Sequence, residues 1–165
     1  MIQKLTKKTE EVLEYFFKHP TEEVHIRGLS DATGVPYSSV RNALHNLEEK
    51  GLVKKREESK MTFYTANRES DEFRRQKRVY NLETLYNSGV IDALDKGLRP
   101  DAIVLFGSYL QGSDTEESDI DIAVEYDETI EEVTDTHISL VADLTRILGR
   151  DDIDVVRLTS VDPRI

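Results

Sequence analysis

The sequence contains no cysteine, which excludes disulfide bonds and thiolate-bound metal sites. It also has no apolar run long enough to span a bilayer, and its first residues show no signal-peptide pattern. We therefore expect a cytoplasmic protein without a membrane association. A chain of 165 residues has room for one or two small domains.

No lysine follows Lys96, and the net charge of -11 is unevenly distributed. Residues 1–68 hold 12 basic and 10 acidic side chains, residues 69–100 hold 6 of each, and residues 101–165 hold 4 basic and 17 acidic side chains. The segments thus carry +2, 0 and -13, which add up to -11. This asymmetry indicates parts with different partners, although an adaptation to high salt would also produce an acidic segment.

The stretch Ile103–Val124 combines a buried strand, a glycine turn and an alternating strand. The apolar run Ile103–Phe106 predicts a strand buried on both faces. Gly107 allows the backbone to approach a ligand closely, and Ser108 suits the start of a short helix. Free N–H groups at a helix start are a natural site for phosphate.

Two aspartates alternate with isoleucines in the second strand of this stretch. Asp119 and Asp121 are two residues apart and therefore share one face of the strand. Adjacent carboxylates repel each other unless a cation lies between them, and magnesium prefers carboxylate and phosphate oxygens. A surface strand with solvated acids beside an ordinary turn is the alternative. The combination and order of these features favour a phosphate and metal site.

The Gly107-Ser108 turn, ten residues and then Asp119-Ile120-Asp121 resemble the signature of the DNA polymerase beta-like nucleotidyltransferase superfamily. The resemblance is greatest to its minimal nucleotidyltransferase branch and covers roughly the last 65 residues, a span consistent with a small domain. Gly112 and Ser118 also match that branch. Gln111 stands where the branch has a basic residue.

The resemblance implies transfer of a nucleoside monophosphate from an NTP, with ATP favoured, to a hydroxyl acceptor, with release of pyrophosphate. It implies that Asp119 and Asp121 hold one Mg2+ ion and that a third carboxylate joins them around a second ion. That carboxylate is Asp154, with Asp152 as the reserve candidate. The implied nucleotide-binding residues are Gly107, Ser108, Gly112 and Ser118.

The N-terminal segment shows a different pattern. Apolar spacing predicts helices at 1–19, 27–33 and 37–50, an extended piece at 24–26, and strands at 52–56 and 61–65. This order is similar to the winged helix-turn-helix of prokaryotic transcription regulators, with 37–50 as recognition helix. A protein-interaction or dimer module is the alternative. The residues expected to contact double-stranded DNA are Tyr37, Ser38, Ser39, Arg41, Asn42 and His45 on the helix and Lys54, Lys55, Arg56 and Lys60 on the wing.

Residues 69–100 are predicted to form a helical connector. Phe73, Val79, Leu82, Leu85 and Tyr86 recur at nearly helical spacing. A solvated helix face is one explanation for this segment, and packing in a homodimer is the other. Beyond the central stretch, we expect an amphipathic helix at 129–148 and a strand at 152–158.

The fold predicted from these patterns is α+β. It comprises a winged helix-turn-helix at 1–68, the helical connector at 69–100 and a small α/β nucleotidyltransferase domain with a mixed sheet at 101–165. Three functions remain open. The first is a DNA-binding nucleotidyltransferase, such as an autoregulating antitoxin that attaches AMP to an all-helical toxin-type partner, as the resemblance implies. The second is a transcription regulator whose degenerate transferase domain only binds nucleotide. The third is a protein-interaction module. The presence of all three carboxylates favours the first.

Overall fold

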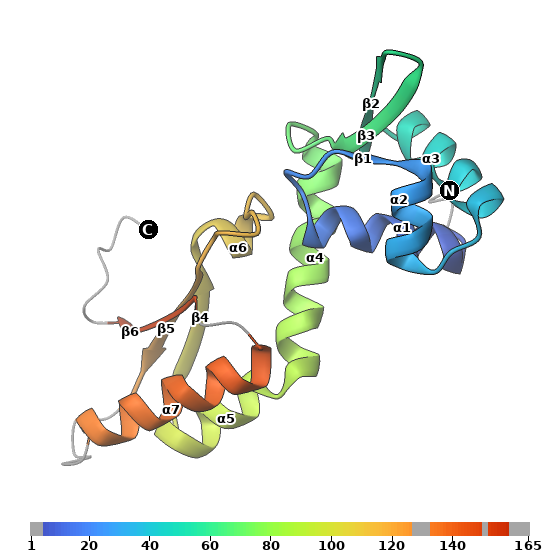
Figure 1. Ribbon diagram of the computed structural model, residues 1–165. Helices are drawn as coiled ribbons and strands as arrows, with labels where there is room; N and C mark the ends of the chain where they lie inside the picture. Colours follow the sequence, from blue (N-terminus) through green and yellow to red (C-terminus); the bar gives the residue numbers. More distant parts are fainter. Residues whose placement is uncertain (1–4, 127–132, 150–151, 159–165) are drawn as a thin grey trace. The chain divides into compact units, whose positions relative to one another are not determined.

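The computed structural model describes residues 5–126, 133–149 and 152–158, the side chains of residues 133–138 excepted. These residues form two compact units that divide between residues 77 and 78. Figure 1 shows the elements of both units. The boundaries proposed above at 68 and 100 remain a prediction.

The first unit is built from three helices and a small antiparallel sheet. Its elements are α1 (Lys7–Lys18), β1 (Val24–His25), α2 (Ile26–Thr33), α3 (Tyr37–Glu49), β2 (Val53–Glu58) and β3 (Met61–Ala66). The sheet order is β1-β3-β2, and both pairings are antiparallel. Helix, strand, helix, helix and hairpin is the order of a winged helix, so the predicted architecture is confirmed.

Local sequence explains where these helices begin and end. The Thr6 side chain accepts a hydrogen bond from the Thr9 backbone N–H and caps α1. Gly34 ends α2 with a φ of 70°, in the left-handed region that favours glycine. The predicted apolar stripe of α3 is buried, and its members are Val40, Ala43, Leu44 and Leu47.

The long helix α4 (Asp71–Ser88) contributes to both units. Near its start, Phe73 is buried with its ring centroid 5.3 Å from that of Phe17. Near its end, Leu85 joins the core of the second unit. Val79 and Tyr86 are 52% and 71% exposed. The helical prediction for this segment is therefore confirmed, but two members of its apolar stripe face solvent.

The second unit contains a mixed three-stranded sheet with two helices on one face (Figure 1). Its further elements are α5 (Val90–Leu98), β4 (Ala102–Phe106), α6 (Gly107–Gln111), β5 (Ile120–Glu125), α7 (Val133–Leu148) and β6 (Ile153–Arg157). The strand order is β4-β5-β6, with β4 antiparallel and β6 parallel to β5. The predicted mixed sheet is confirmed. The first four residues of the helix predicted at 129–148 lie outside the described residues.

The core of this unit lies between the sheet and the helices α5 and α7. Ile120, Ile122 and Val124 of β5 pack there with Leu94 and Leu144. This burial fixes the register of β5, because a shift of one residue would turn its apolar side chains out and its aspartates in.

The prediction that β4 is buried on both faces is wrong. β4 lies at the edge of the described sheet, and Val104 is 39% exposed. An apolar, β-branched run identifies a strand but does not say whether the strand has one neighbour or two.

Candidate functional site

The Gly107 turn and the aspartate strand meet at the end of β4. Gly107 has a φ of 69°, and a Cβ atom at this position would overlap the Asp121 carboxylate. Glycine is therefore required twice here, once for its left-handed backbone and once for the space it leaves. In the register of the sheet, Asp121 lies opposite Phe106, the residue before this glycine.

The three carboxylates lie on or beside two neighbouring parallel strands. Asp121 on β5 is in register with Asp154 on β6, and Asp119 directly precedes β5. Burial, and then the negative charges of Asp154 and Asp119, raise the pKa of the Asp121 carboxyl. Among the described residues, no lysine, arginine or histidine forms an ion pair with these three carboxylates. Their mutual repulsion is therefore relieved by no side chain that the structure describes.

The chemistry of these residues fits a hard divalent cation. Magnesium in phosphate-transfer sites is commonly held by one or two carboxylates together with substrate phosphates. Within the described residues, no group of three or more histidine or acidic side chains is close enough to hold an ion as placed. Asp121 and its in-register neighbour Asp154 therefore offer carboxylate oxygens as ligands for such an ion. Phosphate oxygens of the substrate would have to complete its coordination.

The four residues predicted to bind nucleotide lie at different places in and after this turn. Gly107 and Ser108 begin α6, and Gly112 ends it with a φ of 70°. The Ser118 hydroxyl accepts a hydrogen bond from the Thr115 backbone N–H at 2.9 Å. Gly112 and Ser118 thus shape the loop that leads to Asp119, whereas Gly107 and Ser108 lie at the turn itself.

Most of the recognition-helix residues that were predicted to contact DNA line one hollow on the surface of the first unit. It is lined by the predicted Tyr37, Ser38, Arg41, Asn42, His45 and Lys55, together with Glu48 and Tyr64. Burial raises the pKa of the Tyr64 hydroxyl. Sequence reasoning missed Glu48 and Tyr64 as members of this surface.

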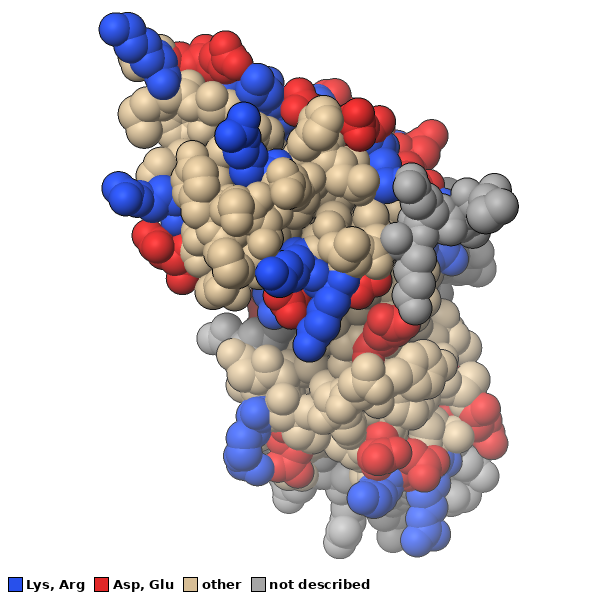
Figure 2. Space-filling model, turned by 90° about the vertical axis from the view of Figure 1, so that its right-hand side faces the viewer, with Lys and Arg blue, Asp and Glu red and all other residues tan. Residues whose placement is uncertain are grey.

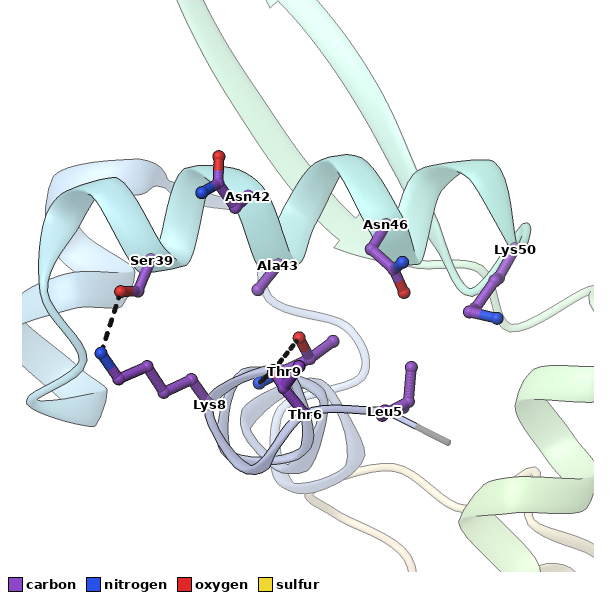
Figure 3. Close-up of a pocket in the computed structure, with 9 residues that line it drawn as sticks. All are labelled: Leu5, Thr6, Lys8, Thr9, Ser39, Asn42, Ala43, Asn46 and Lys50. Carbon is purple, nitrogen blue, oxygen red and sulfur yellow. Dashed lines mark hydrogen bonds between the residues drawn. The ribbon is translucent and has the colours of Figure 1, made fainter. Parts of the chain in front are cut away.

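Ser39 lies apart from this hollow. The Lys8 ammonium group donates a hydrogen bond to the Ser39 hydroxyl at 3.2 Å. Figure 3 shows both residues in a groove between α1 and α3, where the Thr6 cap also lies. Asn42 lines this groove as well as the hollow. The structure therefore places Ser39 beside α1, and Asn42 is a predicted residue that lines both this groove and the hollow.

Three of the four cations predicted on the wing are paired with acidic side chains. Arg56 donates to Glu23 and Glu58, and its guanidinium carbon lies 5.4 Å from the centre of the Phe63 ring. These hydrogen bonds lower the pKa of Glu23. Lys54 pairs with Glu69, and Lys55 pairs with Glu57.

Lys60 differs from the other wing cations, because the described residues provide it with no ion pair. It lies in the tight turn between β2 and β3, with a φ of 71°. On the face that Figure 2 presents, lysine and arginine are interspersed with acidic side chains and do not form one continuous patch.

Comparison with known proteins agrees with the architecture of both units. The penicillinase repressor family matches residues 5–102, and the family described as polymerase beta, nucleotidyltransferase, matches residues 89–165. The protein thus combines a repressor-type winged helix-turn-helix with a nucleotidyltransferase domain. Because the first match covers more than half of its length, the chain belongs to the penicillinase repressor family.

One curated relative is a Methanocaldococcus jannaschii protein named "Putative protein adenylyltransferase MJ1379". It is 43% identical over 60 residues, which are 36% of this chain and 59% of the relative. The chain thus covers less than two thirds of the length of that relative. No solved structure matches the chain. None of the helices that the structure describes has the length and apolar character needed to cross a bilayer.

Proposed function

We propose that this protein is a DNA-binding nucleotidyltransferase that transfers AMP from ATP to a hydroxyl group of a partner protein. The observation that carries the proposal is the Asp121 carboxylate, which lies against the Gly107 turn, in register with Asp154 and two residues after Asp119. The nucleotidyltransferase match of the same segment supports the reaction type. The name of the M. jannaschii relative supports AMP as the transferred group and a protein as the acceptor.

In the proposed mechanism, Asp119 and Asp121 would hold one magnesium ion, and Asp154 would join them in holding a second. The bound metal would lower the pKa of the attacking hydroxyl and neutralise charge on the phosphates. Gly107 and Ser108 hold the phosphates that leave. The acceptor oxygen bonds to the α-phosphorus while the bond from that phosphorus to pyrophosphate breaks. Asp154 orients the hydroxyl and accepts its proton.

The winged helix would direct this chemistry to a DNA locus. The hollow on α3 carries Tyr37, Arg41, Asn42 and His45, which are side chains able to donate to phosphates and base edges. We propose that it binds double-stranded DNA and regulates transcription. A protein that uses DNA and ATP belongs in the cytoplasm, where both are present.

We further propose that the protein acts as a homodimer and as an antitoxin towards an all-helical partner. The exposed Val79 and Tyr86 of α4 motivate the dimer. The antitoxin role follows from the resemblance to the minimal nucleotidyltransferase branch. The boundaries near residues 68 and 100 belong to the same proposal.

The second candidate is a transcription regulator whose transferase domain only binds nucleotide. Gln111 supports it, because a basic residue at this position of the minimal branch would attract triphosphate and glutamine carries no charge. The two candidates differ in covalent chemistry and not in nucleotide binding.

The test uses the protein with magnesium and ATP labelled at either the α- or the γ-phosphate, with the protein itself and a helical partner as acceptors. We expect label from the α-phosphate, and none from the γ-phosphate, to become attached to protein. Asp121→Asn should abolish the transfer, whereas Asp95→Asn, which changes an exposed aspartate on α5, should preserve it. Nucleotide binding without any transfer of label would support the regulator instead.

A further inference from the structure

Two polar side chains that the proposed mechanism does not use are buried together in the second unit. Asn81 of α4 is 2% exposed, and Asp114 of the loop after α6 is 6% exposed. The Asn81 amide nitrogen donates to the Asp114 carboxylate at 2.9 Å. It also donates to the Tyr109 backbone carbonyl at 2.8 Å. One side chain of α4 therefore holds both α6 and the loop that follows it.

This arrangement has little tolerance for displacement. A buried amide or carboxylate that loses its partner cannot regain water, so the loss costs free energy of folding. An asparagine amide has two N–H donors, and here each has an acceptor. An apolar contact would tolerate sliding, whereas these two hydrogen bonds fix both the direction and the distance between α4 and residues 109 and 114.

The segment held in this way carries the proposed active site. The turn at Gly107 and Ser108 directly precedes Tyr109, and Asp114 lies five residues before Asp119. Between them, the Ser113 backbone N–H donates to the Ser108 carbonyl at 3.1 Å. The Thr115 N–H donates to the Ser118 hydroxyl. The loop is thus tied at both ends, and Asn81 links it to a helix outside the loop.

We propose that Asn81 and Asp114 are positioning residues for the nucleotidyl-transfer site, an inference that relies on the function proposed above. They fix the loop between α6 and β5, so that the phosphate-binding turn and the aspartate pair keep their relative placement. Both side chains are buried, and the proposed mechanism gives neither of them a contact with the nucleotide. Their effect is on the affinity for magnesium–ATP, because small displacements between a phosphate site and its metal ligands weaken both.

The test compares two variants by calorimetric titration of ATP in the presence of magnesium. Asn81→Leu removes both hydrogen bonds and keeps a side chain of similar size. Leu144→Ala removes a buried side chain of α7 from the core of the same unit and serves as the control for lost stability. Both variants are measured well below their unfolding temperatures. We expect Asn81→Leu to raise the Kd for magnesium–ATP about tenfold and Leu144→Ala to change it less than about threefold.

A second pair of variants at the same positions keeps the test informative if Asn81→Leu does not fold. The exchange Asn81→Asp with Asp114→Asn restores a hydrogen bond between positions 81 and 114 but leaves the Tyr109 carbonyl without its donor. We expect this double variant to bind magnesium–ATP more tightly than Asn81→Asp alone. Equal weakening by Asn81→Leu and Leu144→Ala, or no recovery in the exchange, would overturn the positioning role alone. Failure of the unaltered protein to bind magnesium–ATP would overturn the proposed function together with it.

Discussion

At the scale of single residues, Asp121 is the side chain on which the site depends most. It lies over Gly107, opposite Asp154 and two residues after Asp119, and its carboxyl pKa is raised by burial and by both aspartates. A raised carboxyl pKa means that the folded protein binds a proton more tightly than the unfolded chain does. The charged form of Asp121 therefore destabilises the fold when no cation is bound.

The first prediction concerns stability and pH without divalent cations. The contribution of Asp121 to the free energy of unfolding is fully present below the ordinary aspartate pKa of about 3.9. It is lost as pH rises through the raised pKa of the folded protein. At neutral pH, Asp121→Asn should therefore be more stable than the unaltered protein in EDTA. Denaturant unfolding across pH 4–8 measures the difference. A variant that is less stable at neutral pH would contradict the prediction.

Magnesium should reverse this order. An ion that binds only the folded state stabilises it by about 2.7 kcal/mol at 100 times its Kd. We expect this gain for the unaltered protein and for the exposed-site control Asp95→Asn, but not for Asp121→Asn. Equal stabilisation of all three proteins would mean that magnesium binds elsewhere.

The second prediction concerns the space above Gly107. Gly107→Ala should destabilise the protein through left-handed backbone strain, about 1–2 kcal/mol, and through overlap with the Asp121 carboxylate, about 1–3 kcal/mol. In an Asp121→Ala background only the strain remains, so the same substitution should cost about 1–3 kcal/mol less. Urea unfolding of the double-mutant cycle measures this coupling. Additivity within about 0.5 kcal/mol would show that the two residues do not meet.

The sequence indicated which residues could form a site but not how each is used. The Gly107 turn and the Asp119–Asp121 pair could be found because their spacing is local and each residue type has a chemical reason. Asn81 could not be found, because it sits in a polar helix segment and its partners are 28 and 33 residues away. Ser39 was grouped with the DNA-facing residues, but a single serine gives no sign that Lys8 binds it.

At the scale of elements, three of the four cations predicted on the wing are already paired with acidic side chains. Glu23, from the segment between α1 and β1, receives two hydrogen bonds from Arg56 of β2. Exposed ion pairs of this kind contribute about 0–1 kcal/mol, so DNA phosphate can compete for the guanidinium group. We therefore expect Glu23 to weaken DNA binding without being required for the fold.

The third prediction follows from this competition. Glu23→Gln should remove one of the two ion pairs of Arg56, the other being with Glu58, and raise affinity for double-stranded DNA about two- to fivefold at low salt, the range that an exposed ion pair allows. Fluorescence anisotropy with labelled duplex at several salt concentrations measures the effect. Glu22→Gln removes the same charge from the neighbouring residue, which bonds Tyr15 and not Arg56. An equal gain in this control would mean that net charge, and not the loss of the Glu23–Arg56 ion pair, is responsible.

Element types were predictable from periodicity, whereas their surroundings were not. The stripe of α3 was identified correctly because four apolar residues at helical spacing need a core. The same logic failed for α4, where Phe73 and Leu85 enter separate cores and Val79 remains exposed. It failed again for β4, since a sheet edge and a sheet centre can carry the same apolar run. The number of elements that pack against a helix or strand depends on the tertiary structure, and local sequence patterns do not encode it.

At the scale of the whole molecule, the chain combines a mildly basic part with a strongly acidic one. Residues 1–68 carry a net charge of +2 and residues 101–165 carry -13. The acidic part would repel a polyanion, so DNA and nucleotide should use different surfaces. Each compact unit has its own core and its own candidate site.

The fourth prediction is that the two binding activities can be removed separately. Arg41→Ala should weaken duplex binding at all sequences and reduce the salt dependence by about one phosphate contact, while magnesium–ATP binding stays unchanged. Asp121→Asn should do the reverse. Anisotropy and calorimetry on the same preparations measure both. Loss of both activities in either variant would indicate one shared site.

The most direct test of the central claim is calorimetric titration of ATP into the protein with and without magnesium, repeated on the double variant Asp119→Asn/Asp121→Asn. We predict binding that requires magnesium and that disappears in the double variant. Binding that is equal with and without magnesium would contradict the proposed site. The absence of binding to ATP, GTP, CTP and UTP would contradict the nucleotidyltransferase function itself.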